Sequence, residues 1–189
     1  MMRPWVRYLI CGVAGLALGA GGAYRRIHTG ALGANSAIGP WTTGKDFGSA
    51  GAGAYTRAVV ALRGILALPA HEARYYNAAV DSAGDPLDGK CRYRVTGRTI
   101  PSKWWSVTLY DHQGYLVPNQ ANIFSVESSR VPSPAGWTIE VAPAQQAGLW
   151  LPTGRIDRFE LTLRTYLPDD GGIGNLTRDQ LPSIVKEGC

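Results

Sequence analysis

The sequence predicts a mainly β domain, an antiparallel β-sandwich or jelly-roll-like fold with one covering helix, preceded by a single N-terminal transmembrane helix. Three observations support this class. In residues 104–110, WWSVTLY, apolar and polar side chains alternate with the period of two that a half-buried strand requires. The same alternation recurs in residues 137–141 and 159–166. Short segments of this kind are separated by Gly, Pro, Asp and Asn rather than by long helices, which favours a sandwich over a βαβ fold.

The first element of the chain is an apolar run. Tyr8–Tyr24 holds 17 residues without charge, with arginines on both sides. Its length is at the short end for a membrane-spanning helix, and a signal peptide shares its basic start and apolar centre. We therefore expect residues 1–28 to be an uncleaved membrane anchor, with a cleaved signal peptide as the alternative.

Residues 29–54 follow, rich in Gly, Ala, Ser and Thr, and predict a tether between the membrane and the domain. Trp41 is the exception in this segment, and we expect it to dock on the domain. Residues 55–68 predict the helix of the domain, since apolar residues recur on one face until Pro69 ends the pattern. The sandwich domain is expected to span residues 55–189.

The rest of the domain is expected to consist of short strands and a tail. Residues 167–189 predict an irregular tail, with a short helix after Thr177, which has a capping partner in Gln180. The predicted strands are residues 75–80, 91–96, 104–110, 115–117, 123–127, 137–141 and 159–166.

Two cysteines outside the apolar run bear on the compartment. Cys91 lies beside a predicted strand, and Cys189 is the last residue. An even pair in an exported domain predicts a disulfide bond, which forms in an oxidising compartment; two unrelated thiols are the alternative. The positive charges on the two flanks of the apolar run nearly tie, so the positive-inside rule does not decide the orientation. On the cysteine argument we expect a single-pass inner-membrane protein with its C-terminal domain in the periplasm.

The charge of the chain argues against nucleic-acid binding. The net charge is +5, but residues 1–28 contain four arginines and no acid, and 15 basic against 14 acidic residues remain in the rest. No basic stripe is left to follow phosphates. The sequence predicts neither a cofactor nor a metal: His28, His71 and His112 stand far apart without ligand spacing, and no nucleotide loop or nucleophile elbow is present.

A group of aromatic and polar residues forms the candidate ligand site. Tyr110, Arg164 and Tyr166 occupy the polar phases of their predicted strands. If those strands are neighbours, the side chains line one face or one mouth of the sandwich, which suits a small ligand. Stacking of arginine on tyrosine within a sheet face is the structural alternative. The full candidate set, which adds residues at strand ends, is Tyr110, Asp111, Asn119, Trp150, Arg164 and Tyr166.

Ordered motifs along the chain carry a family resemblance. They are DPLDG at 85–89, CRYRV at 91–95, WWSVTLYD at 104–111, Pro118-Asn119, WLP at 150–152, LRTY at 163–166 and LPSI at 181–184. From Trp41 to Cys189 the chain resembles the bacterial domain-of-unknown-function family 1214. One departure is Leu149, which stands where the family often has asparagine.

The resemblance implies a β-sandwich without a settled activity, so no catalytic residues are carried over. It also implies that in longer relatives a second domain, unknown-function family 1254, precedes this one in the same polypeptide. We therefore expect a separately encoded family-1254 protein as a partner. The main hypothesis is a membrane-anchored cell-envelope protein whose sandwich binds a partner or a small ligand. The alternatives are an envelope enzyme that uses Asp111, Asn119 and Arg164 around an aromatic pocket, and a structural spacer.

Overall fold

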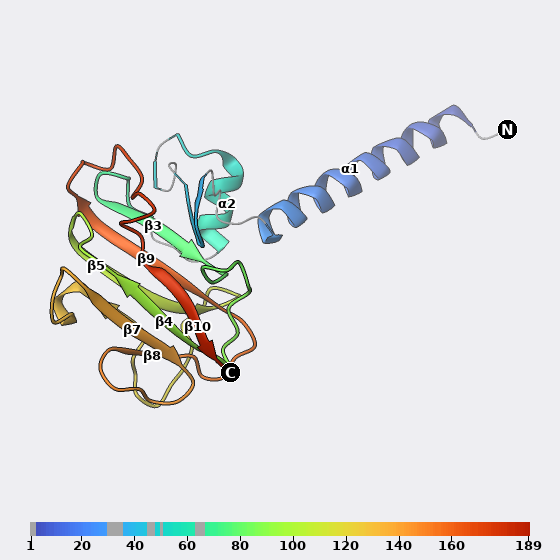
Figure 1. Cartoon of the computed structure of the whole chain (residues 1–189). Coiled ribbons are helices and arrows are strands. Elements are labelled where there is room, and N and C mark those ends of the chain that lie inside the picture. The colour runs from blue at the N-terminus through green and yellow to red at the C-terminus, as the bar shows by residue number, and fades with distance from the viewer. Residues whose placement is uncertain (1–2, 30–35, 45–47, 50, 63–66) are drawn as a thin grey trace.

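The structure is a computed structural model that describes residues 3–29, 36–44, 48–49, 51–62 and 67–189. In this part of the chain, two β-sheets form a sandwich, and a long N-terminal helix projects away from it (Figure 1). The predicted class, mainly β with few helices, is confirmed. The elements are α1 Pro4–Thr29, β1 Ser36–Ile38, β2 Trp41–Thr43, α2 Ala54–Leu62, β3 Ala73–Ala78, β4 Arg92–Gly97, β5 Ser102–Asp111, β6 Ser125–Glu127, the short 3-10 helix η1 Ser128–Arg130, β7 Trp137–Ala142, β8 Trp150–Pro152, β9 Phe159–Pro168 and β10 Ser183–Gly188.

The larger sheet is built around β9. Its strands have the order β1-β2-β3-β9-β5-β6, and every neighbouring pair is antiparallel. β9 pairs with β5 from Phe159 to Pro168 and with β3 from Leu161 to Tyr166. Alternate residues of β9 therefore lie between the two sheets, and the residues between them lie on the outer face.

The smaller sheet has the order β10-β4-β7-β8. β4 is antiparallel to both β10 and β7, whereas β7 and β8 run parallel. The sandwich is therefore mixed at this pair rather than antiparallel throughout. Residues 143–149 connect the parallel strands and form a loop at one end of the sandwich.

The core fills the space between the two sheets. Trp105 of β5 stacks on Trp137 of β7, with ring centres 4.4 Å apart. Gly97 is required for this contact, because a Cβ at that position would lie 2.1 Å from Cζ2 of Trp137. Full burial of a large apolar side chain stabilises a fold by about 2 kcal/mol. The inward phases of both sheets, which supply these side chains, therefore provide the main stabilisation of the sandwich.

The predicted apolar helix is present as α1. Its segment Pro4–Arg25 has 22 residues and a mean hydropathy of 1.5, and it is not buried against the rest of the chain. A helix of this length spans about 33 Å, which matches the hydrocarbon thickness of a bilayer. It is the helix among the described residues that is long and apolar enough to cross a membrane.

Part of the segment expected to be a tether belongs to the fold. Residues 36–43 form the β1–β2 hairpin, which extends the larger sheet at β3. Trp41 is completely buried in the core, and its indole N–H donates a hydrogen bond to the carbonyl oxygen of Pro182 at 2.7 Å. The expected docking of Trp41 is therefore confirmed, and the sequence missed the hairpin because its strands have three residues each.

The covering helix is shorter than predicted. α2 ends at Leu62, residues 63–66 lie outside the described part of the chain, and residues 67–68 are not helical. Val60 of α2, together with Ala67 and Leu68, packs against Ala73 and Tyr75 of β3. The helix and the segment after it therefore cover part of the outer face of the larger sheet, as Figure 1 shows beside β3.

The predicted strands are present as β3, β4, β5, β6, β7 and β9, with β6 shorter than the predicted residues 123–127, but two other predictions are wrong. Residues 115–117 form only an isolated bridge between Tyr110 and Leu116. The tail is not irregular: β10 pairs with β4, and the segment after Thr177 is a turn in which the Leu181 N–H donates to the Thr177 carbonyl. The sequence hides β10 because Ile184 is its single buried apolar residue.

The predicted disulfide bond is present. The Sγ atoms of Cys91 and Cys189 are 2.04 Å apart, and the two residues are separated by 98 positions. The bond ties the end of β10 to the start of β4. It therefore closes a loop that contains most of the sandwich.

Replacing Cys189 by Ser is expected to lower the free energy of unfolding by about 4 kcal/mol, because the open chain regains the entropy of a long loop. Urea unfolding of the full-length protein in detergent, followed by tryptophan fluorescence, measures this. The matched control is Cys11→Ser, since Cys11 is a free, exposed cysteine on α1. Equal stability of the two variants contradicts the prediction.

Candidate functional site

The outer face of the larger sheet collects three of the six candidate residues. Tyr110 lies on β5, whereas Arg164 and Tyr166 lie on β9. Tyr110 pairs with Glu160 and Arg164 pairs with Ser106, so the three side chains share one side of the sheet. The opposite phase of both strands is buried in the core. The two strands are therefore neighbours, as the candidate site requires.

Arg164 is the centre of this face, and its guanidinium is held by its neighbours. Nη2 donates a hydrogen bond to the Tyr110 hydroxyl at 2.8 Å, and Nη1 donates to the Thr108 hydroxyl at 3.2 Å. Cζ lies 5.3 Å from the ring centre of Tyr110 and 6.0 Å from that of Tyr75, within the range of cation–π attraction. The arginine thus links three strands of the sheet.

Exposed apolar side chains lie next to this face. Trp104 packs edge-on against Tyr166, with ring centres 5.1 Å apart, and is 37% exposed. Leu167 and Ile173 are 57% and 86% exposed. The Leu167 N–H donates a hydrogen bond to the carbonyl oxygen of Glu72. Gly172, the residue before Ile173, lies so close to Ala70 that a Cβ on it would be 2.0 Å from the Ala70 carbonyl oxygen. Leu167 and Ile173 therefore both lie beside residues 70–72. We call Trp104, Leu167 and Ile173 the apolar patch.

Leu167 has an unusual backbone conformation. Its φ is +48°, in the left-handed region that residues with side chains rarely adopt. Such a conformation costs of order 1 kcal/mol and persists where surrounding contacts impose it. Here it interrupts the alternation at the end of β9, and the leucine side chain remains largely in solvent.

Asp111 does not join the other candidates. Its Oδ1 accepts hydrogen bonds from the N–H groups of Gln113 and Tyr115, both at 2.9 Å. These bonds close the turn after β5, which is a usual role for aspartate. The side chain therefore shapes a turn.

Asn119 and Trp150 lie together, but around a separate pocket of about 600 Å³. The amide of Asn119 is used by the backbone: Nδ2 donates to the carbonyls of Val117 and Ile123, and Oδ1 accepts from the Ile123 N–H. The Trp150 indole N–H donates to the Ala142 carbonyl at 3.0 Å. The six candidates thus divide between a sheet face, a turn and a pocket.

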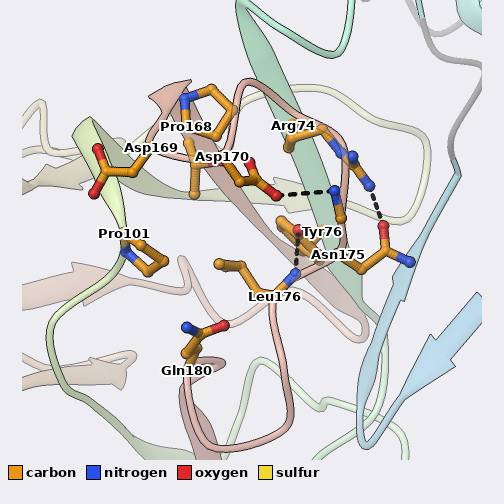
Figure 2. Close-up of a pocket in the computed structure, with 11 residues that line it drawn as sticks. Arg74, Tyr76, Pro101, Pro168, Asp169, Asp170, Asn175, Leu176 and Gln180 are labelled. Carbon is orange, nitrogen blue, oxygen red and sulfur yellow. Dashed lines mark hydrogen bonds between the residues drawn. The ribbon is translucent and has the colours of Figure 1, made fainter.

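Figure 2 shows another pocket, whose lining residues are not among the six candidates. It has a volume of about 450 Å³ and is lined by residues of β3, by the end of β9 and by the loop that follows β9. Residues 73–78 do not alternate between apolar and polar side chains, so no local pattern indicated that Arg74 shares the inner side of β3 with Tyr76. The lining residues are Arg74, Tyr76, Pro101, Thr165, Pro168, Asp169, Asp170, Gly174, Asn175, Leu176 and Gln180.

Arg74 is the buried charge of this pocket, with 4% of its surface exposed. Nη1 donates to the Gly172 carbonyl at 2.8 Å, and Nη2 donates to Oδ1 of Asn175 (Figure 2). Nε is buried without a partner, and among the described residues no carboxylate lies within 4.0 Å of the guanidinium. Because an unpaired buried charge is costly, Arg74 depends on the loop that supplies these oxygens.

Two more groups hold the same loop. The Tyr76 hydroxyl accepts a hydrogen bond from the Leu176 N–H at 2.9 Å, and burial raises the pKa of Tyr76. Asp170 accepts from the N–H groups of Gly174 and Gly172, and these bonds hold its pKa below the ordinary value. Asp170 is therefore ionised at neutral pH, and the loop is fastened at three points.

Within the described residues, no three His, Cys, Asp or Glu side chains are grouped closely enough to hold a metal ion. The described residues form a β-sandwich domain with an arginine–aromatic sheet face and pockets that are lined by loops.

The family follows from a direct match. Residues 72–170 match the model of the protein of unknown function family DUF1214, and the chain belongs to that family. The matched segment runs from β3 to β9. It includes the strands that line the two pockets, β3, β8 and β9, as well as Arg164 and Tyr166. None of the curated proteins matches the chain.

A solved structure shares the fold, and a second is similar over part of the chain. The VPA0106 protein from Vibrio parahaemolyticus superposes with a TM-score of 0.55 at 24% identity, covering 72% of this chain and 36% of its own. A putative uncharacterized protein from Burkholderia cenocepacia has a TM-score of 0.44 at 17% identity, covering 60% of this chain and 30% of its own. This chain therefore spans about a third of the length of these proteins.

Substituting Arg74 by Met is expected to lower the free energy of unfolding by about 2 kcal/mol, because the Gly172 carbonyl and the Asn175 amide lose a charged donor. Urea unfolding measures the difference. Arg94→Met is the matched control: Arg94 is exposed and paired with Glu140 and Glu187, and exposed pairs contribute less than about 1 kcal/mol. A larger loss in Arg94→Met contradicts the assigned role of Arg74.

Proposed function

We propose that this protein is a membrane-anchored binding module of the cell envelope, and that its sandwich docks a separately encoded family-1254 partner. The observation that carries the proposal is the apolar patch of Trp104, Leu167 and Ile173 beside the arginine–aromatic face. Groups of exposed apolar side chains on a soluble domain are typical of interaction surfaces. Trp104 contacts Tyr166, and both Leu167 and the backbone beside Ile173 contact residues 70–72, so the three lie in one region of the larger sheet.

The membrane part of the proposal is supported by α1 and by the disulfide bond. α1 is apolar, exposed along its length and long enough to cross a bilayer. Disulfide bonds persist in oxidising compartments such as the periplasm. With α1 in the inner membrane, the Cys91–Cys189 bond supports a periplasmic position for the sandwich.

The length comparison supports a protein partner. Some two thirds of the VPA0106 chain lies outside the fold that it shares with this protein. The family resemblance implies that such additional sequence in longer relatives contains a family-1254 domain. On this proposal, a contact made within one polypeptide in such relatives is made between two chains, and anchoring to one membrane surface raises the effective concentration of the two.

The charge around the patch indicates what the partner surface contains. Asp169 and Asp170 are exposed and follow β9 directly, between Leu167 and Ile173 in the chain. The lowered pKa of Asp170 keeps it negative. A complementary surface therefore has an apolar centre with lysine or arginine at its rim.

The geometry favours binding over the enzyme alternative. That alternative needed Asp111, Asn119 and Arg164 around one pocket. Asp111 and Asn119 instead hold backbone turns, and Arg164 is bonded to Tyr110 and Thr108. All three polar groups are thus bonded within the fold, and they do not share one pocket.

A C-terminal alkaline phosphatase fusion is expected to be active and to sediment with membranes, because α1 anchors the chain with its domain outside the cytoplasm. The same fusion without residues 1–28 is the control and is expected to be inactive. Full-length protein in the soluble cytoplasm contradicts the proposed location. A shorter soluble form in the periplasm that begins near Gly21 identifies the segment as a cleaved signal peptide instead.

The double variant Leu167→Asp/Ile173→Asp is expected to weaken binding to a purified family-1254 protein by at least about tenfold, because two charges enter an apolar contact. Binding is measured by co-purification and by calorimetry with both full-length proteins in detergent. Val185→Asp is the matched control, since Val185 is a 48% exposed aliphatic residue on the smaller sheet. Absence of a wild-type complex refutes the partner, and an equal loss in Val185→Asp refutes the patch.

A further inference from the structure

The pocket around Trp150 indicates a ligand class that differs from a protein partner. We propose that this pocket binds a neutral saccharide. Its volume of about 600 Å³ lies in the usual range for small-ligand sites. Its walls come from residues 118–121 and 143–145, and β8 contributes Trp150 and Pro152.

The lining contains no charged side chain, although the pocket lies in a fully described part of the chain. Sites for phosphate and carboxylate groups use arginine, lysine or free backbone N–H groups. Sites for ammonium groups use carboxylates or several aromatic rings. A pocket without either charge therefore favours an uncharged ligand.

Trp150 supplies the apolar surface of the site. Its N–H is already bonded to the Ala142 carbonyl, so the ring contacts a ligand through its carbon atoms. The face of an indole carries negative charge density and attracts polarised C–H groups. One face of a sugar ring presents several such C–H groups, which gives the ring a flat surface for a tryptophan.

Two glutamines supply the polar contacts. Gln120 and Gln145 are exposed, belong to two different loops that line the pocket, and make no side-chain hydrogen bond with another described residue. A side-chain amide both donates and accepts, as a sugar hydroxyl does. Two free amides beside an aromatic ring therefore match a ligand that has hydroxyls at its edge and C–H groups on its face.

The walls of the pocket are held in place without a ligand. The amide of Asn119 closes its loop through three hydrogen bonds to Val117 and Ile123. Gly154 has φ +60°, and a Cβ at that position would lie 2.7 Å from Cγ1 of Val117. Glycine thus lets the loop after β8 approach the 117–118 segment closely. A preformed pocket of this kind binds with a lower ordering cost.

A proline-rich peptide is the competing occupant, because prolines and a tryptophan line the site. Grooves that recognise such peptides contain several aromatic rings in a row. This pocket contains one, Trp150, and the prolines belong to the protein. A single ring in a pocket that also holds two free amides suits one sugar unit better than an extended helix of proline residues.

The experiment is an array of neutral glycans probed with the full-length protein in a detergent without a sugar headgroup. At least one neutral glycan is expected to be retained. Saturation-transfer NMR with that glycan then gives the affinity, and Gln145→Leu is expected to weaken it about tenfold through the loss of a hydrogen-bonding partner. Trp150→Ala is expected to abolish binding. Gln113→Leu is the matched control, because Gln113 is exposed in the turn after β5 and does not line the pocket.

Four outcomes overturn the assignment. They are the absence of any retained neutral glycan, a preference for acidic glycans, an affinity that Gln145→Leu leaves unchanged, and binding of a decaproline peptide in place of the glycans. Gln145 is exposed, so its variant is expected to fold and the result is informative even if Trp150→Ala is unstable. Loss of family-1254 binding leaves this result unaffected, because the apolar patch and this pocket share no residue.

Discussion

The position of β9 between β3 and β5 is the constraint on which the rest of the structure depends. β9 is hydrogen-bonded along both edges, so it cannot shift along its neighbours without breaking its pairing with both β3 and β5. Leu161 and Leu163 are completely buried on one side, whereas Arg164 and Tyr166 point to the other. A shift of one residue would exchange these sets and place an arginine in the core. One strand therefore determines both the packing of the sandwich and the composition of its outer face.

Polar side chains that resemble catalytic candidates are used here to hold loops. Arg74 and Asp170 fasten the loop after β9, Asp111 closes the turn after β5, and Asn119 closes the loop at residues 118–123. Each bond satisfies backbone groups that strand ladders leave unpaired. These bonds offset part of the conformational entropy that is lost when the loops become ordered. Side chains that make these bonds hold the loops that line the pockets.

Much of the fold was predictable from local patterns. The alternation in residues 104–110, 137–141 and 159–166 predicted strands because each has one buried and one polar face. The apolar run predicted α1, and the even pair of cysteines predicted the disulfide bond. The hairpin at residues 36–43 was missed because its strands have three residues each, and β10 was missed because it has a single buried apolar residue. Both take their stability from a strand far along the chain.

The sequence by itself determined the class of this protein: a sandwich built from alternating strands, an apolar N-terminal helix and a covalent bond between two cysteines. Only the tertiary structure decided which candidate residues meet. Arg164 joins Tyr110 because β9 and β5 are paired in one register, whereas Asn119 joins Trp150 because the loop that follows β5 of the larger sheet meets β8 of the smaller sheet. The pocket of Arg74 appears only when the loop after β9 folds back over β3. Local periodicity sets which way a side chain points, and long-range pairing sets what it meets there.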